Sequence, residues 1–176
     1  MQDLGARAPD DFGRRIDVSR ETLAKLELLV GQIRAWQDRV NLVGRSTLND
    51  IWERHIFDSA QLYTLVPEGA RILVDLGSGA GFPGLVLAVM GVPDVHLVEP
   101  DRRKAAFLRH TVARLGIPVT LHAARAQDVQ PFTADVVTAR ALAPLRRLLQ
   151  LAEPFVGGGT VCLFPKGRRL DDELTD

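Results

Sequence analysis

Residues 71–84 read RILVDLGSGAGFPG, and this stretch decides the fold class. A short apolar run over residues 71–75 leads directly into a loop with alternating glycines, Gly77, Gly79 and Gly81. A run of this length that ends in glycines is typical of a buried strand. Glycine lets the backbone turn sharply and lets a ligand approach it closely. The stretch therefore predicts a strand with a ligand-binding loop at its carboxyl end.

Strand-like and helix-like segments alternate after this stretch. Pro83 suits the first turn of a helix that runs to about residue 90, and Asp101 suits the cap of a second helix that ends at Gly116. A third helix is expected over residues 142–152. Further strands are expected at residues 95–98, 119–122, 134–139 and 160–164. This alternation predicts a Rossmann-like α/β core, with a mainly parallel sheet and helices on both faces.

The first 68 residues carry helical patterns instead. Ser19 can cap a helix whose apolar residues recur at helical spacing up to Val40, and a second helix is expected over about residues 48–65. We expect residues 1–68 to form a helical extension packed on a core of residues 69–176, and not an independent domain.

Charge is distributed unevenly, although the chain of 176 residues has a formal net charge of zero. Residues 1–101 hold 10 Lys and Arg against 15 Asp and Glu, whereas residues 102–170 hold 12 against 3. An excess of this kind favours a polyanionic partner such as nucleic acid, because each neutralised phosphate releases counterions. A solvated basic face paired with the acidic half is the alternative.

The chain shows neither a membrane span nor a signal peptide, and its single cysteine, Cys162, cannot form an internal disulfide. These features predict a cytoplasmic location.

Three further polar features are expected at the carboxyl edge of the sheet, beside the loop Gly77-Ser78-Gly79. Asp75 stands directly before the loop. Glu99 follows the second strand, where a carboxylate can accept hydrogen bonds from both hydroxyls of a ribose. Asp128 follows the third strand, beside the expected place of an adenine ring.

Residues 79–84 also match the dinucleotide fingerprint G-x-G-x-x-G, with Glu99 following. The negative charge of Asp75 disfavours a pyrophosphate but suits the ammonium and sulfonium of S-adenosylmethionine. Moreover, the only tyrosine, Tyr63, lies outside the expected sheet. The sequence therefore favours an S-adenosylmethionine-dependent methyltransferase over a nicotinamide-dependent oxidoreductase.

The loops also bear on which atom is methylated. Carbon-5 of cytosine needs a cysteine nucleophile, but Cys162 lies in an apolar run and is expected to be a buried packing residue. The expected fourth strand ends in TARALAP (residues 138–144), without the Asp/Asn-Pro-Pro-aromatic loop typical of exocyclic amine methylation. N7 of guanine has an in-plane lone pair and no proton, so its methylation needs alignment but no general base.

Five segments together resemble one known family, the bacterial small-subunit ribosomal RNA methyltransferase G, also called glucose-inhibited division protein B. They are NLV (41–43), RHIFDS (54–59), residues 75–84, TARA (138–141) and KG (166–167). The resemblance runs from about Val18 to Gly167.

The resemblance implies methylation of guanine N7 at position 527 of 16S rRNA, in the rRNA or the small subunit. It also implies cofactor contacts at Gly77, Phe82, Ala126, Gln127 and Arg140. The family often has Glu in place of Gln127, and it normally continues past residues 166–167 into another pair of strands. We therefore expect the strand over residues 160–164 to form a bare edge.

Arg140 and Lys166 are expected at the rim of the site, to contact cofactor or RNA. His55 and Asp58 lie three residues apart on one helix face, where His55 positions the target base or supports the helix structurally. No third ligand for a metal stands at suitable spacing. A monomer is expected. The rival hypotheses are a small-molecule methyltransferase and a non-catalytic RNA-binding assembly factor.

Overall fold

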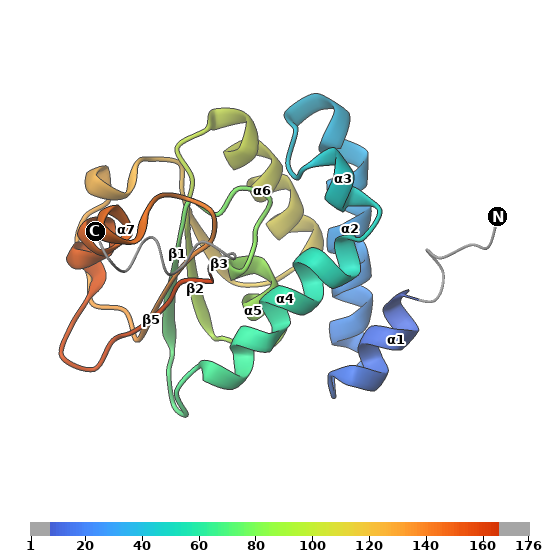
Figure 1. The fold of residues 1–176 in the computed structure, drawn as a ribbon, viewed down its shortest axis with the longest axis horizontal. Helices are drawn as coiled ribbons and strands as arrows, with labels where there is room; N and C mark the ends of the chain where they lie inside the picture. The colour runs from blue at the N-terminus through green and yellow to red at the C-terminus, as the bar shows by residue number, and fades with distance from the viewer. Residues whose placement is uncertain (1–7, 166–176) are drawn as a thin grey trace.

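The computed structural model describes residues 8–165, which form a five-stranded sheet with helices on both faces (Figure 1). The strands are β1 (Ile72–Leu76), β2 (Asp94–Val98), β3 (Val119–His122), β4 (Val136–Ala139) and β5 (Val161–Leu163). Their order is β3-β2-β1-β4-β5, and every neighbouring pair is parallel. The predicted Rossmann-like core is thereby confirmed, because β1 lies at the centre and its glycine loop opens at the carboxyl edge.

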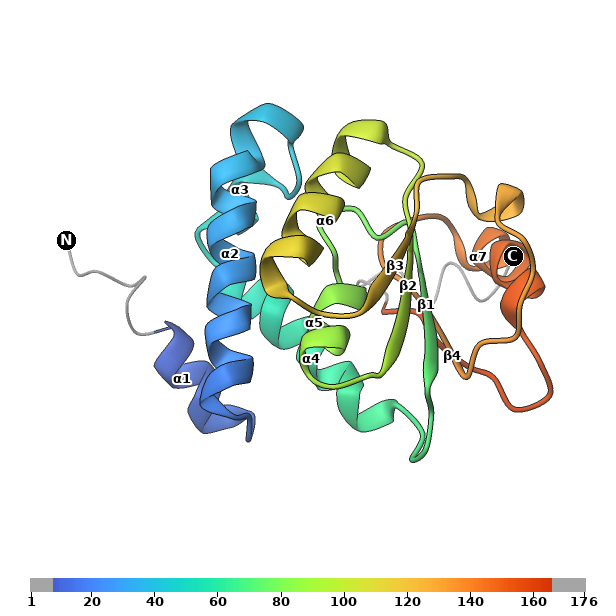
Figure 2. The ribbon, with the colours of Figure 1, turned by 180° about the vertical axis from the view of Figure 1, so that it is seen from behind.

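Most of the helices cover one face of the sheet, and α7 (Leu145–Ala152) covers the other (Figure 2). The first face carries α1 (Ala8–Arg15), α2 (Arg20–Val40), α3 (Arg45–Leu48), α4 (Asp58–Ala60), α5 (Gly84–Val89) and α6 (Arg102–Leu115). Helix α6 begins at the predicted cap, where the Asp101 carboxylate accepts the backbone N–H groups of Arg103 and Lys104.

The helical extension differs in detail from its prediction. Helix α2 begins after Ser19, whose hydroxyl accepts the Thr22 backbone N–H, and ends at Asn41 in the left-handed conformation. The expected second helix is continuous from Ile51, but its hydrogen-bond pattern changes from a π-helical turn η1 (Trp52–Phe57) through α4 to a 3-10 turn η2 (Gln61–Leu65), and the short helix α3 precedes it. Sequence periodicity of 3.6 residues does not distinguish these tighter and wider turns.

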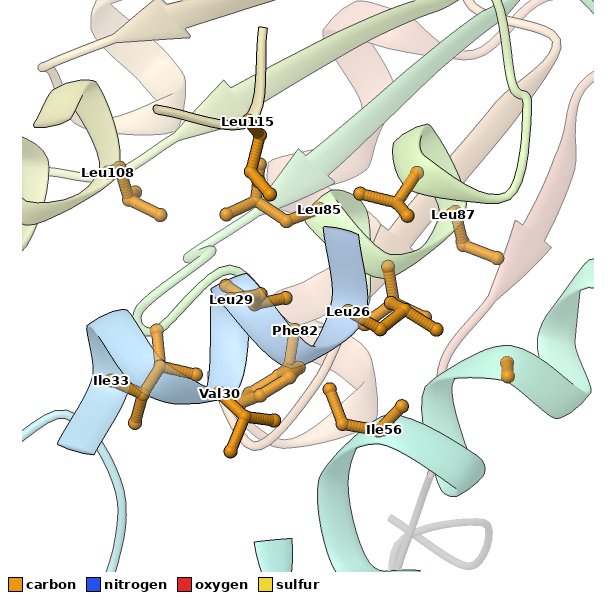
Figure 3. Packing of buried hydrophobic residues seen from close by; sticks show 14 of the residues in the cluster. Leu26, Leu29, Val30, Ile33, Ile56, Phe82, Leu85, Leu87, Leu108 and Leu115 are labelled. Atoms are coloured by element: carbon orange, nitrogen blue, oxygen red, sulfur yellow. The ribbon is translucent and has the colours of Figure 1, made fainter. Parts of the chain in front are cut away.

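The extension and the sheet share one hydrophobic core. Fully buried Leu26, Leu29 and Ile33 of α2 pack in the same cluster as Ile56 of η1 and Leu85 of α5 (Figure 3). A second cluster, which includes Val74, Val137 and Phe155, fills the space between the sheet and α7. The extension is therefore packed against the sheet, while the division of the chain at residue 68 stays a prediction.

Strand β5 forms one edge of the sheet as far as the chain is described. Its half-buried Val161 and Leu163 share one side, and Cys162 between them points to the other. Cys162 is exposed, so the prediction of a buried packing residue was wrong. The apolar run suggested burial, but an edge strand is covered on only part of its surface.

The expected helix over residues 142–152 begins later, at Leu145, because residues 141–144 form a loop. The remaining short turns are η3 (Ala126–Asp128) and η4 (Glu153–Phe155). Within residues 8–165, no helix combines the length and the apolar character that crossing a bilayer requires.

Candidate functional site

The glycine loop after β1 is shaped by contacts with the neighbouring strand. The backbone N–H groups of Gly77 and Ser78 both donate to the carbonyl oxygen of Val98, at 2.8 and 3.1 Å. Gly77 has a φ of +69°, and a Cβ placed there would lie 2.6 Å from Cδ1 of Leu142. Only glycine fits this position without strain, since the conformation is left-handed and the neighbouring space is filled.

Asp75 is fully buried and faces into the protein. Its carboxylate accepts the Thr138 hydroxyl at 2.8 Å and the Gly84 backbone N–H at 3.2 Å. Burial raises the pKa of Asp75 to about 6, although these hydrogen bonds and the charge of Arg140 act in the opposite direction. The carboxylate thus ties β1 to β4 and to the start of α5.

Glu99 lies at the end of β2, with 5% of its surface exposed. One carboxylate oxygen accepts the Gly79 backbone N–H at 2.7 Å, and the other accepts the Asp101 backbone N–H at 2.8 Å. Each oxygen has a second lone pair, so hydroxyl groups of a ligand can still bind. Glu99 is therefore fixed against the glycine loop in an orientation that suits a ribose.

The segment after β3 lies at the same edge of the sheet, because the Glu99 backbone N–H donates to the His122 carbonyl at the end of β3. Ala126 is buried in η3, while Gln127 and Asp128 are exposed. Glu99 and η3 thus lie on the β2–β3 side of the loop.

A cavity of about 1320 Å³ opens on the other side of the loop. It is larger than the roughly 300–1,000 Å³ typical of a pocket for one small molecule. Gly77, Ser78 and Gly79 form one wall. The other walls come from the helical extension, from the loop after β4, from Phe82 before α5 and from the first turn of α6. They include Thr47, Arg54, His55, Asp58, Ser59, Phe82, Lys104, Arg140 and Leu142. The volume allows two ligands to lie side by side.

Three predicted site residues meet in this cavity. Nη2 of Arg140 is 2.9 Å from Nδ1 of His55, and Nη1 donates to the backbone carbonyl of Arg54 at 3.3 Å. The His55 ring stacks on Phe82 with the ring centroids 5.1 Å apart, and Cζ of Arg140 lies 5.0 Å from the Phe82 centroid. The motifs RHIFDS, GFPG and TARA therefore converge at one wall.

His55 is held as a neutral imidazole. Burial lowers its pKa to about 4, and the charges of Arg140 and Arg54 act in the same direction. Nε2 of His55 lies 2.9 Å from the hydroxyl of Thr47. The cavity wall thus combines a neutral histidine with the cations Arg54, Lys104 and Arg140 and the carboxylate of Asp58. The excess of positive charge suits an anionic or electron-rich ligand.

Sequence reasoning missed three residues of the cavity. Thr47 contacts His55 across the break between α3 and η1. The buried hydroxyl of Ser59 has no hydrogen-bond partner among the described residues, so a polar group of a ligand can satisfy it. Leu142 packs on Gly77 from the loop after β4. Only Ser59 carried a sequence signal, as the last residue of the motif RHIFDS.

Lys166, the remaining predicted site residue, lies outside the described residues. Within residues 8–165, no group of three His, Cys, Asp or Glu side chains could hold a metal ion.

The sequence matches a family model described as rRNA small subunit methyltransferase G over residues 22–176. Two curated proteins named Ribosomal RNA small subunit methyltransferase G are similar to the chain. The protein from Rhodospirillum centenum is 59% identical and the match covers 94% of this chain and 76% of that protein. The protein from Paramagnetospirillum magneticum is 58% identical, with coverages of 95% and 82%.

Solved structures share the fold at low sequence identity. A precorrin-8w decarboxylase from Methanobacterium thermoautotrophicum aligns with a TM-score of 0.55 at 19% identity and covers 67% of each chain. M. jannaschii TYW2, solved in complex with AdoMet, aligns with a TM-score of 0.52 at 19% identity over 59% of this chain and 48% of that chain. These similarities support the fold class alone.

Proposed function

The chain belongs to the rRNA small subunit methyltransferase G family, as its sequence resemblance predicted, and we propose that it methylates N7 of a guanine in 16S rRNA. The methyl donor is S-adenosylmethionine, and the target that the resemblance implies is the guanine at position 527. The rival hypotheses of a small-molecule methyltransferase and of a nicotinamide-dependent oxidoreductase lose their support, because the relatives carry the name of an rRNA methyltransferase.

The residues at the carboxyl edge of β1 and β2 fit the donor. We assign the ribose hydroxyls to Glu99, whose carboxylate is already fixed beside the loop by two backbone N–H groups. The methionine part would lie along Gly77, Ser78 and Gly79, which line the cavity. Ala126 and Gln127 would border the adenine. When bound, the donor supplies an electrophilic methyl group on a positively charged sulfur.

The sequence predicted that Asp75 contacts S-adenosylmethionine directly. In this proposal it has a structural role instead. Its carboxylate is engaged by Thr138 and Gly84 inside the loop. We therefore propose that Asp75 shapes the loop and contributes a negative field beneath it, without contacting the donor.

The acceptor would lie against the wall formed by His55, Phe82 and Arg140. A guanidinium has five N–H donors and no acceptor, so two bonds to the chain leave donors for the guanine or its phosphate. N7 carries no proton, so the reaction needs alignment and exclusion of water more than a base. His55 suits this role, because a neutral imidazole adds no repulsion against the positive sulfur.

Helix α6 supports an RNA acceptor. Arg102, Arg103 and Arg109 are exposed on it, and Lys104 at its first turn lines the cavity. No carboxylate pairs with these side chains among the ion pairs of the described residues. A basic helix that leads away from the cavity can follow a phosphate backbone.

The single observation that carries the proposal is the convergence of Arg140, His55 and Phe82 on a cavity that also borders the glycine loop. It can be tested by tritiated methyl transfer to 16S rRNA and to small subunits that lack the modification, followed by mapping of the base. We expect one methyl group per rRNA, and none when 7-deazaguanosine, which lacks N7, replaces the target guanosine.

Two variants make this test specific. Arg140→Lys keeps the charge but cannot form the planar pair of bonds to Arg54 and His55, so we expect at least a hundredfold loss of turnover. Arg71→Ala removes an arginine at the opposite edge of the sheet and should retain activity. Full methylation of the 7-deaza substrate, or wild-type turnover by Arg140→Lys, would contradict the proposal.

The remaining predictions concern the assembly and its place in the cell. That the chain acts as a monomer stays a prediction. A cytoplasmic location, the contribution of Lys166 and the choice between free rRNA and the small subunit stay predictions. Comparing transfer rates on naked 16S rRNA and on subunits decides the last of these.

A further inference from the structure

Three hydrogen bonds connect α3 with the end of β4 across the cavity wall. The Thr47 hydroxyl is 2.9 Å from the Gly44 carbonyl oxygen, which precedes α3. The same hydroxyl is 2.9 Å from Nε2 of His55, and Nδ1 of His55 is 2.9 Å from Nη2 of Arg140. These hydrogen bonds therefore form one series, which links a backbone carbonyl, a hydroxyl, an imidazole and a guanidinium.

The two groups at the ends of this series, the Arg140 guanidinium and the Gly44 carbonyl, fix the direction of every hydrogen bond in it. Arg140 can only donate, so Nδ1 of His55 accepts and carries no proton. In a neutral imidazole the proton is then on Nε2, which donates to the oxygen of Thr47. The proton of the Thr47 hydroxyl goes to the Gly44 carbonyl, which can only accept. One tautomer of His55 satisfies all three bonds, and the other brings Nδ1–H against an Arg140 N–H.

The surroundings of His55 restrict both the orientation and the ionisation of its ring. Its plane lies within 14° of the Phe82 plane, so stacking fixes the orientation. Arg140 from the end of β4 and Arg54 from η1 both disfavour a second proton on the ring, and Asp58 and Lys104 are the other charged residues that line this cavity. Ionisation is therefore suppressed at neutral pH, so the ring exchanges only between its Nδ1–H and Nε2–H tautomers, of which Nε2–H satisfies the three hydrogen bonds.

We propose that Thr47 is a positioning residue for methyl transfer, because its hydroxyl accepts the Nε2–H of His55 and so stabilises, together with Arg140, the tautomer that holds the Arg140 guanidinium. This inference rests on the proposed function. Thr47 lines the cavity, and in this proposal it acts on the acceptor through His55 and Arg140. Without the hydroxyl, Nε2–H has no acceptor, the Nδ1–H tautomer gains population, and Arg140 loses its bond to the ring.

The kinetic test compares three variants of α3. Thr47→Val replaces the hydroxyl by a methyl group of similar size, and we expect kcat to fall about tenfold or more while KM for S-adenosylmethionine changes less than about twofold. Thr47→Ser restores the hydroxyl and should recover most of kcat. Ser46→Ala removes a neighbouring exposed hydroxyl from the same helix and should behave as wild type.

The tautomer can be measured without any methyl transfer. The chain has four histidines, so ¹⁵N NMR of histidine-labelled protein is tractable, and His55→Gln assigns the His55 signals. We expect a protonated Nε2 and an unprotonated Nδ1 in the wild type and in Thr47→Ser. In Thr47→Val the Nδ1–H form should appear. If the wild-type protein transfers no methyl group to rRNA, the proposed function is wrong. The NMR measurement still determines the tautomer of His55 in that case.

Two outcomes would overturn the inference. One is an Nδ1–H tautomer of His55 in the wild type. The other is a Thr47→Val variant that loses kcat while His55 keeps its tautomer, since Thr47 would then act by another route. If Thr47→Val fails to fold, Thr47→Ser together with Thr47→Ala at reduced temperature provides the same comparison.

Discussion

The carboxylate of Asp75 on β1 accepts a 2.8 Å hydrogen bond from the hydroxyl of Thr138 on β4, and both residues are completely buried. The bond crosses between two adjacent parallel strands whose paired residues are these two. The acid that sequence reasoning assigned to the donor is therefore part of the scaffold of the glycine loop, and this has a measurable consequence for stability.

Asp75 makes the free energy of unfolding depend on pH. Its folded pKa, about 6, exceeds its ordinary value of 3.8, so the folded protein binds more protons than the unfolded chain between these values. Stability from this group is fully present below about pH 4 and is lost as the pH rises through about 6. We expect Asp75→Asn to gain about 3 kcal/mol relative to wild type between pH 4 and pH 7.

Urea denaturation at several pH values measures this difference. Asp135 provides a control of opposite sign, because its carboxylate accepts the backbone N–H groups of Arg71 and Ile72, and these bonds lower its pKa. Asp135→Asn should therefore lose stability relative to wild type as the pH rises to just above the ordinary pKa of this carboxyl, 3.8, and the two profiles should run parallel at higher pH. Parallel pH profiles for wild type and Asp75→Asn would show that Asp75 titrates normally.

Gly77→Val should abolish binding of S-adenosylmethionine. Valine disfavours a φ of +69°, and its side chain would meet Leu142 in the space beside the loop. We expect affinity in calorimetry to fall more than about a hundredfold, and stability to fall by about 1–3 kcal/mol. The left-handed backbone at Gly77 makes this substitution more disruptive to folding than the sequence suggested.

Gly69→Val separates the loss of backbone stability from the loss of affinity for S-adenosylmethionine. Gly69 also has a left-handed φ, +81°, but a Cβ there would meet nothing within 4 Å. This variant should lose a similar amount of backbone stability and keep its donor affinity. Equal donor affinity in Gly77→Val and wild type would contradict the assignment of the loop.

Glu99→Gln should weaken the binding of S-adenosylmethionine and also destabilise the glycine loop. Both carboxylate oxygens accept backbone N–H groups, from Gly79 and Asp101, whereas an amide offers one oxygen and one NH₂ donor. The backbone N–H of Gly79 or of Asp101 then faces the NH₂ group of the introduced amide, and the lost hydrogen bond costs about 1–3 kcal/mol of stability. We expect donor affinity to fall about tenfold or more, measured by calorimetry, with Glu68→Gln on an exposed loop as the neutral control.

Arg102 and Arg109 should contribute to the salt dependence of RNA binding. They lie seven residues apart on α6 and therefore share one exposed face. If each neutralises one phosphate, replacing either by Ala lowers the slope of log affinity against log salt by about 0.7–0.9. Filter binding of 16S rRNA between low and moderate salt measures the slope. Arg71→Ala should leave it unchanged, and unchanged slopes for Arg102→Ala and Arg109→Ala would remove α6 from the RNA surface.

Local patterns in the sequence were sufficient for the parts of the fold that depend on local chemistry. The capped helices at Ser19 and Asp101 begin where they were predicted, because a capping side chain binds backbone groups two or three residues away. The succession of strands along the chain and the glycine loop after β1 also follow from local burial and turn signals, whereas the order of the strands in the sheet was not predicted. The π-helical pattern of η1 and the exposed face of Cys162 could not be predicted, since they depend on neighbouring elements.

By itself, the sequence determined the α/β core, the glycine loop with Glu99 beside it, and the family, because each is encoded in short segments whose chemistry is local. Only the tertiary structure decided that His55 and Arg140, 85 residues apart, form one hydrogen bond over Phe82, and that Asp75 turns inward to Thr138. It also brought Thr47 to His55. Side-chain contacts of this kind depend on how the helices pack on the sheet, to within about an ångström, and no local pattern specifies that distance.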